Sequence, residues 1–333
     1  MMTDNCFFYV TYTPEGYFTL ATKPTFSADR NFVIKGYRPS VKQKIFDTIR
    51  TELKKRGETC TVFRTDCGCD GLYSSDEGLR IIDGTYITFD ETDYEQIILD
   101  TDIIGTEPIL IGRNDAVQRA VRFLSACRCI NNDMARLEAK NIDTAKANRY
   151  AARLWSQAGG IMKGCIGTEH KRFITCITSD GVELDTAAFG MCERVTVISD
   201  RTGACARHIT DRVRRYALSA GYDVISCLCP LNVELGAEHI IIPDLRYGIF
   251  VNKYHHKADL YPCRKTFSER FMTDGTDNKN RIDFSFKAYK RLMQEVFSSL
   301  ETVEYCDSEL DKIPNRNNNE EIIGNFMKTL FLC

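Results

Sequence analysis

Two segments of this chain place glycines and basic side chains where an apolar strand runs into a helix, an arrangement that can bind phosphate. In the first, a strand over residues 32–34 leads into Gly36, and Lys42 and Gln43 follow at the start of a helix. Backbone N–H groups at a helix N-terminus attract anions, a lysine can neutralise a phosphate, and a hydroxyl after the lysine normally binds magnesium. Gly36 and Lys42 are therefore candidate nucleotide-binding residues, and Gln43 is a longer, weaker ligand in place of the hydroxyl.

The first loop also departs from G-x-x-x-x-G-K-[ST], the sequence pattern of a working phosphate-binding loop. Pro39 removes one backbone donor, and Val41 places a branched side chain where the phosphate must come close. Two interpretations of Lys42 follow: a residual phosphate contact, or a solvated lysine at the start of a helix.

The second segment retains less of this chemistry. A strand over residues 195–198 leads into Asp200, Gly203 and Arg207, with Ala206 at the position of the lysine. Asp200 introduces a negative charge beside an anion site. Arg207 can hold a phosphate but cannot bind magnesium as a hydroxyl does. Gly203 and Arg207 are therefore weaker candidates for nucleotide binding, and a solvated Arg207 is the alternative.

A magnesium site also needs an acidic side chain, which is expected at the end of the third strand. In the first half this strand is predicted over residues 79–89 and is followed by Asp90. In the second half Val251 takes the corresponding place. Asp90 is therefore the candidate catalytic residue, and a solvated acidic loop is the other explanation of the same sequence.

The two loops belong to a repeat that covers most of the chain. Each half has a short strand with a Thr-x-x-Gly turn, then the strand, loop and helix, then further apolar strands and a helical region. Alternating strands and helices predict a parallel sheet with right-handed crossovers. Residues 115–158, and residues 284–300 with 320–332, are expected to form helical hairpins. We therefore predict an α/β fold of two tandem P-loop NTPase-like domains, residues 1–160 and 168–333, each with a parallel sheet flanked by helices and followed by a helical hairpin.

Composition excludes several classes of function. The chain has 333 residues, 43% hydrophobic and 27% charged, which is typical of globular proteins. A formal net charge of −2 gives no general attraction for nucleic acid or an acidic membrane surface. No apolar run approaches the length that spans a bilayer, and the N-terminus lacks the features of a signal peptide. We expect a cytoplasmic protein that binds neither nucleic acid nor membranes.

The 15 cysteines are expected to be reduced in such a protein. Many lie in apolar strand sequence, where a free thiol packs as a small apolar group. Three Cys-x-Cys pairs occur, but there is no Cys-x-x-Cys and histidine is scarce. We therefore predict no metal site, with metal binding at these pairs as the less favoured alternative.

The chain resembles a family of bacterial tandem P-loop proteins that are described as predicted ATPases and carry two NTPase-like domains in one chain. The similarity rests on Thr13-Pro14-Glu15-Gly16, on the strand, loop and helix around Gly36 and Lys42, on residues 220–229, and on residues 240–250 with His256. It covers nearly the whole chain. Members of the family have an intact Gly-Arg-Pro-Gly-x-Gly-Lys-Ser loop, which both halves of this chain lack. The resemblance implies a role in binding ATP and Mg²⁺ for Lys42 and Gly36, and none for Ala206.

Three hypotheses for the function follow. In the first, the chain is a divergent NTPase-like pseudoenzyme with weak or no ATP hydrolysis, residual nucleotide binding in its first half, and an unidentified protein partner. In the second, it is an active ATPase or nucleotide-dependent kinase that relies on Lys42 and Asp90. In the third, side chains such as Val41 fill both pockets and the chain is an interaction scaffold. Loss of both loop motifs favours the first hypothesis and argues against robust catalysis.

Overall fold

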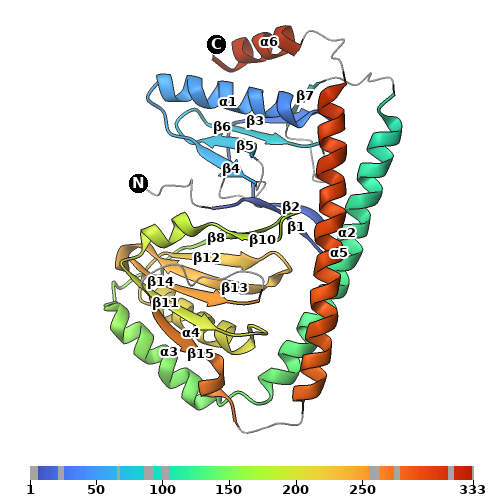
Figure 1. Ribbon diagram of the computed structural model, residues 1–333. Helices are drawn as coiled ribbons and strands as arrows, with labels where there is room; N and C mark the ends of the chain where they lie inside the picture. Colours follow the sequence, from blue (N-terminus) through green and yellow to red (C-terminus); the bar gives the residue numbers. More distant parts are fainter. Residues whose placement is uncertain are drawn as a thin grey trace.

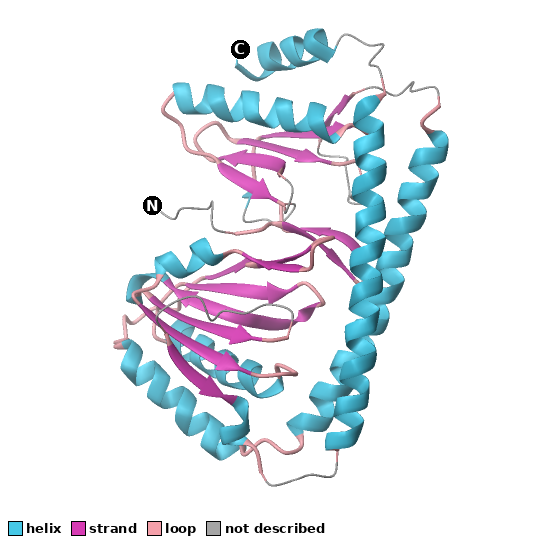
Figure 2. Ribbon diagram, viewed as in Figure 1, coloured by secondary structure: helices cyan, strands magenta, loops and turns pink. Residues whose placement is uncertain are grey.

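The computed structural model describes residues 7–21, 26–65, 68–85, 94–99, 105–254, 263–273, 278–313 and 319–331. These residues form two main β-sheets, with helices on their outer faces and two long helices along one side (Figures 1 and 2). The structure therefore confirms the α/β class that the sequence predicts.

The first sheet has five strands in the order β4-β5-β6-β3-β7. Its strands are β3 (Arg30–Lys35), β4 (Thr61–Arg64), β5 (Cys69–Ser74), β6 (Leu79–Asp83) and β7 (Glu95–Ile98). Strand β3 runs parallel to both of its neighbours, β6 and β7, whereas β5 runs antiparallel to β4 and β6. The strand that feeds the first loop thus lies in the parallel part of a mixed sheet.

The second sheet has the order β15-β11-β14-β13-β12-β8. Its strands are β8 (Glu169–Arg172), β11 (Arg194–Ser199), β12 (Val224–Cys229), β13 (Asn232–Ile242), β14 (Tyr247–Asn252) and β15 (Arg264–Phe267). Apart from the added edge strand β8, the order and directions of the strands repeat those of the first sheet, with β11 in place of β3. The repeat in the sequence therefore corresponds to two sheets of the same topology.

In each half a helix follows the loop and covers the outer face of its sheet (Figure 1). These helices are α1 (Pro39–Lys55) and α4 (Ala204–Ser219). Both are amphipathic, because apolar side chains recur at helical spacing; in α1 the buried ones are Ile45, Phe46, Ile49 and Leu53. The glycines just beyond the two helices, Gly57 and Gly221, adopt φ angles of 77° and 89°, a left-handed conformation that ends a helix.

Two small hairpins lie between the sheets (Figure 1). They consist of β1 (Val10–Thr13) with β2 (Gly16–Thr19), and of β9 (Thr175–Ile177) with β10 (Val182–Leu184). Phe8 and Phe173, next to the hairpins, exchange two backbone hydrogen bonds of 2.8 and 3.1 Å. Phe63 of the first sheet and Phe250 of the second belong to the same hydrophobic core around these hairpins. The two halves thus share their central core.

The long helices α2 (Glu107–Ala139) and α5 (Lys279–Lys312) pack along each other beside both sheets (Figure 1). Their buried side chains, among them Leu124 of α2 and Val296 of α5, form a core of their own. The shorter helix after each one covers the other half: α3 (Thr144–Ala158) packs on α4, and α6 (Asn319–Phe331) packs on α1. Among the described residues, no helix is both long enough and apolar enough to cross a membrane.

The predicted helical hairpins are therefore wrong, although the helices themselves are present. Helix α2 has 33 residues and extends over about 50 Å, whereas α3 has only 15. So long an apolar stripe needs an equally long partner, and α5, with 34 residues, supplies it. Each long helix carries the chain from its own half to the other.

The sheets also differ from the prediction in two ways. They are mixed rather than parallel, because β5 and β13 add antiparallel strands that the sequence analysis did not separate. In the second half, the apolar stretch over residues 239–250 is divided by a turn at Pro243–Leu245. In the first half, β6 ends at Asp83, short of the predicted end at residue 89.

Candidate functional site

The first loop is short and leads directly into α1. Strand β3 ends at Lys35 and α1 begins at Pro39, so Gly36, Tyr37 and Arg38 alone join them. A phosphate-binding loop needs a longer segment that turns several N–H groups toward the anion. In this chain the residues from Pro39 onward are already helical, whereas in a phosphate-binding loop the corresponding residues would surround the phosphate.

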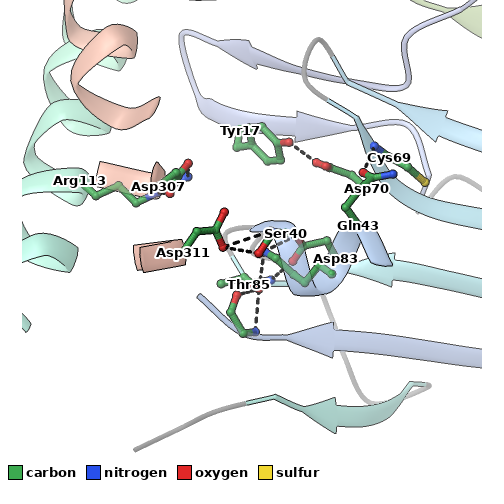
Figure 3. Close-up of polar contacts among 12 residues, drawn as sticks. Tyr17, Ser40, Gln43, Cys69, Asp70, Asp83, Thr85, Arg113, Asp307 and Asp311 are labelled. Carbon is green, nitrogen blue, oxygen red and sulfur yellow. Dashed lines mark hydrogen bonds and ion pairs between the residues drawn. The ribbon is translucent and has the colours of Figure 1, made fainter. Parts of the chain in front are cut away.

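A carboxylate from α5 already lies at the N-terminus of α1 (Figure 3). Asp311 Oδ1 accepts a hydrogen bond of 2.7 Å from Ser40 Oγ and one of 3.3 Å from the Ser40 backbone N–H. Helix N-termini favour negative charge. Asp311 therefore occupies part of the space that a ligand phosphate would use.

Lys42 lies in the first turn of α1 and forms a buried ion pair with Asp83, at the carboxyl end of β6. The distance from Lys42 Nζ to Asp83 Oδ2 is 2.5 Å, and the two side chains are 5% and 12% exposed. Lys42 Nζ also donates to Thr85 Oγ1 at 3.4 Å. The structure thus places Asp83 beside the lysine; Asp90, the residue expected there, lies outside the described residues.

Gly36 is held by contacts within the protein. Its N–H donates to Thr85 Oγ1 at 3.0 Å, and the Thr85 hydroxyl donates to the Gly36 carbonyl at 2.8 Å. A Cβ atom at this position would lie 2.9 Å from Leu99 Cβ, so the close approach of the segment after β7 requires a glycine. The Gly36 amide is therefore already bonded.

Gln43 connects α1 to the start of β5 (Figure 3). Its Oε1 accepts from the Cys69 backbone N–H at 3.0 Å, and its Nε2 donates to Asp47 Oδ1 at 3.2 Å. Burial raises the pKa of the Cys69 thiol to about 12, so this cysteine remains protonated.

Within the described parts of the chain, there is no group of three or more His, Cys, Asp or Glu side chains that could hold a metal ion.

A cavity of about 300 Å³ lies beside the N-terminus of α1 and is lined by Lys42 and Asp83. Its walls come from the first sheet, the β1-β2 hairpin, the turn between β9 and β10, and helices α2 and α5. Both halves of the chain therefore contribute to one cavity. Its size is at the lower end of the range for small-molecule sites.

One side of the cavity is closed by a second ion pair. Arg113 of α2 donates to both carboxylate oxygens of Asp307 on α5, at 2.6 and 3.2 Å. This two-bond geometry fixes the orientation of both side chains. The arginine is thus engaged and does not act as a free cation for a ligand.

Two further carboxylates in the cavity wall, Asp70 and Glu304, are bonded to neutral hydroxyl groups. Asp70 accepts a short hydrogen bond from the Tyr17 hydroxyl, and Glu304 accepts one of 2.6 Å from Ser179 Oγ. Burial, together with the negative charge of Asp70, holds the pKa of Tyr17 well above its usual value. The cavity wall is therefore more acidic than basic, which favours a ligand that brings positive charge.

In the second half, a carboxylate fills the loop itself. Asp200 is 2% exposed and accepts hydrogen bonds from the backbone N–H groups of Thr202, Gly203 and Ala206, at 3.2, 3.0 and 2.7 Å. These are the groups at the N-terminus of α4 that a bound phosphate would use. Burial raises the pKa of Asp200 and outweighs the three N–H bonds, which favour its charged form. The carboxyl group of Asp200 thus takes the place in the second loop that a bound phosphate would have.

Gly203 and Arg207, the two candidates of the second half, lie beside this occupied loop. Gly203 has a left-handed φ of 80°, and a Cβ atom there would meet Lys253 Cε at 2.6 Å. Lys253 is paired with Glu238 on β13, whose side chain is 3% exposed. Arg207, in the first turn of α4, is close enough to Lys253 for the two positive charges to repel each other.

The strand registers show which residues of the two halves correspond. The pairing of β3 with β6, and of β11 with β14, places Asp83 and Val251 at equivalent positions. In the same way, the repeat in the sequence shows that Lys42 and Ala206 are at equivalent positions. Ala206 and Val251 are both buried in the same apolar core. The buried ion pair of the first half is therefore replaced by two apolar side chains in the second.

The equivalent cavity in the second half is nearly filled. It measures about 40 Å³, and its wall contains the large side chains of Leu231, Tyr289 and Met293. Glu238, which corresponds to Asp70, is neutralised there by Lys253. The two halves therefore share a topology but differ in the space that they leave for a ligand.

Glu138, near the end of α2, gives the second loop a measurable dependence on pH. It accepts a hydrogen bond from the Thr202 hydroxyl, and burial and the charge of Asp200 raise its pKa from 4.5 to about 7. The folded protein thus binds more protons than the unfolded chain between these values, so the free energy of unfolding falls as pH rises through this window. Glu138→Gln lacks this pH dependence. We therefore expect its free energy of unfolding, relative to that of the wild type, to be about 2 kcal/mol higher at about pH 8 than at about pH 5.

Urea denaturation of both proteins at the two pH values measures this difference. The exposed Glu301 provides a matched control, because Glu301→Gln removes the same charge from α5 without a buried environment. The same effect of Glu138→Gln at both pH values would contradict the prediction.

Comparison of the chain with protein-family models, with curated proteins and with solved structures found no match in any of the three. The chemistry of the site therefore has to be inferred from its own geometry.

Two carboxylates of the cavity wall, Asp70 and Asp83, and the carboxylate at the N-terminus of α1, Asp311, were not identified from the sequence. A signal for Asp83 existed, because Gly84 directly after it can end the strand, and this would have aligned Asp83 with Val251. Asp311 had no such signal, since it lies 271 residues after Ser40 and reaches it only through the packing of α5.

Proposed function

We propose that this chain is a divergent tandem P-loop NTPase-like protein whose first-half cavity binds a nucleotide with Mg²⁺, with weak or no hydrolysis. The observation that carries the proposal is the Lys42–Asp83 pair beside a cavity of about 300 Å³. Ligands of open α/β sheets bind outside the carboxyl ends of parallel strands, and helix N-termini favour phosphate. Lys42 is close to both of these features, because it lies at the N-terminus of α1 and beside the carboxyl end of β6.

The acidic wall of the cavity supports a metal complex as the ligand rather than free nucleotide. Oxygen ligands from one or two carboxylates, completed by water and phosphate oxygens, are the usual environment of Mg²⁺ in nucleotide sites. Asp83 is suited to this role when Lys42 turns from it toward a ligand phosphate. Asp70 lies in the same wall and adds to the attraction for a cation.

Four features argue for low affinity and against efficient hydrolysis. The loop between β3 and α1 is too short to wrap a phosphate, and the Gly36 amide is already bonded to Thr85. Gln43 supplies an amide where magnesium would need a hydroxyl. Asp311 places a negative charge at the helix N-terminus, where the phosphate has to lie.

Calorimetric titration with ATP and magnesium tests the proposal. We expect the wild type to bind with a Kd of roughly 1 mM. Asp311→Asn removes the competing charge and is expected to tighten binding about tenfold. Lys42→Ala/Asp83→Val, which copies Ala206 and Val251 of the second half, is expected to abolish binding.

The same titration separates the rival hypotheses. Glu301→Gln is the control for Asp311→Asn, because it removes a carboxylate from the exposed face of the same helix. No binding by either the wild type or Asp311→Asn would overturn the proposal in favour of an interaction scaffold. ATP turnover that disappears in Lys42→Ala/Asp83→Val would favour an active ATPase or kinase instead.

A further inference from the structure

The charges along α5 run against its macrodipole. A helix favours acidic side chains near its N-terminus and basic ones near its C-terminus. The first part of α5 has the opposite character: its basic residues are Lys279, Arg281, Lys287, Lys290 and Arg291, and Asp283 is its one acidic residue. The acidic residues of the last part have partners in the cavity, as Asp307 and Asp311 show. Of the basic residues, Arg281 is paired with Asp133 of α2 at 3.0 Å, and a partner for the others has to be sought on the surface around them.

The first part of α5 meets the second loop in a compact cluster of cations and aromatic rings. The Arg201 guanidinium lies 2.6 Å from Asp283 Oδ1 and 4.0 Å from the centre of the Phe286 ring. Lys290 Nζ lies 3.9 Å from the centre of the Tyr254 ring and 4.8 Å from that of Phe286. The Tyr254 and Phe286 rings pack edge to face, with their centres 5.3 Å apart. Cations and rings thus alternate within one cluster.

This cluster is accessible and carries excess positive charge. Tyr254 of the cluster is 50% exposed, and Phe284, on the same part of α5, is 74% exposed, which are high values for rings of this size. Hydrogen bonding to Arg201, and the charges of Lys279 and Lys287, lower the pKa of Asp283. One carboxylate therefore lies among three cations. Phe284, Lys287 and Arg291 also recur at i, i+3 and i+7, so they lie along one exposed side of the helix.

We propose that this basic-aromatic surface (Arg201, Tyr254, Phe284, Lys287, Lys290 and Arg291) binds single-stranded nucleic acid. Cations along a helix neutralise backbone phosphates, and exposed rings beside them stack on unpaired bases. An acidic peptide would use the cations but not the ring faces. The expectation that the chain does not bind nucleic acid came from the net charge of −2, which averages over this local excess.

Fluorescence anisotropy of a labelled single-stranded oligonucleotide of about 20 nucleotides tests the proposal with the full chain. We expect binding at low ionic strength that weakens steeply with salt. Lys287→Glu/Arg291→Glu is expected to weaken binding at least about tenfold and to reduce the salt dependence. Phe284→Ala is expected to weaken binding several-fold with little change in the salt dependence, because it removes stacking and not charge.

Lys54→Glu/Lys55→Glu, at the end of α1 in the other half, is the matched charge control and is expected to bind like the wild type. Circular dichroism confirms that each variant is folded. Absence of binding by the wild type, or an equal loss in the control, would overturn the proposal. Equal binding of a duplex would remove the role of stacking and overturn it as well. Retention of anionic vesicles or polyglutamate, without oligonucleotide binding, would assign the surface to a different partner.

Discussion

Replacement of Lys42 by alanine is expected to lower the free energy of unfolding by about 3 kcal/mol. The substitution removes the ammonium that lies 2.5 Å from the Asp83 carboxylate, at a site where the Asp83 side chain is only 12% exposed. A buried charge that loses its partner costs more than the intact pair contributes, because the desolvation penalty remains. Urea denaturation followed by circular dichroism measures the change.

The second half of the chain suggests the compensating substitution. Asp83→Val alone leaves Lys42 without its carboxylate and is also expected to destabilise. Lys42→Ala/Asp83→Val reproduces the apolar pair Ala206 and Val251 and is expected to lie within about 1 kcal/mol of the wild type. The double-mutant cycle then gives a coupling energy of about 3 kcal/mol or more.

The pair Arg119–Glu295, which joins α2 to α5 on the surface, is the control for this cycle. Its side chains are 56% and 49% exposed, so a coupling energy below about 1 kcal/mol is expected. A coupling energy equally small for Lys42 and Asp83 would show that the two charges are solvated independently. The proposed centre of the ligand site would then lose its main support.

Asp200→Gly is expected to destabilise the protein by about 3 kcal/mol, because three backbone N–H groups lose their acceptor at a buried position. The same substitution gives the second loop a glycine at the position of Gly36. Inorganic phosphate is expected to restore about 1 kcal/mol, since an anion can take up the freed N–H groups at the N-terminus of α4. Thermal unfolding in phosphate and in chloride of matched ionic strength measures the recovery.

Two comparisons isolate the effect of phosphate in this experiment. The wild type reports the general stabilisation by phosphate, because Asp200 excludes the anion from its loop. Asp180→Gly, in the turn between β9 and β10, changes an exposed aspartate to glycine away from the loop. If phosphate raises the Tm of all three proteins equally, Asp200 does not occupy an anion site.

The sequence alone predicted the elements next to the loops, for identifiable reasons. Apolar residues at helical spacing predicted α1, and the strands around residues 32–34 and 195–198 were recognised from short apolar runs that end in turn residues. These signals are local, because they depend on the side-chain periodicity of a single element. The same locality limits the prediction of strand ends: the end of a strand depends on its neighbours, and β6 ends at Asp83, just before Thr85 bonds with Gly36.

The repeat and the α/β class were thus present in the sequence, which also singled out Lys42 as a candidate residue. The tertiary structure decided which residues lie around that lysine. Asp83 approaches through the pairing of β6 with β3, and Asp311 approaches because α5 is too long to pack within its own half. The structure also distinguished the two loops, because it shows that the Asp200 carboxylate turns back onto the N–H groups of its own helix, a contact that is local in the sequence. Contacts between distant segments leave no periodic pattern in a single sequence, and in this chain they determine which groups surround Lys42.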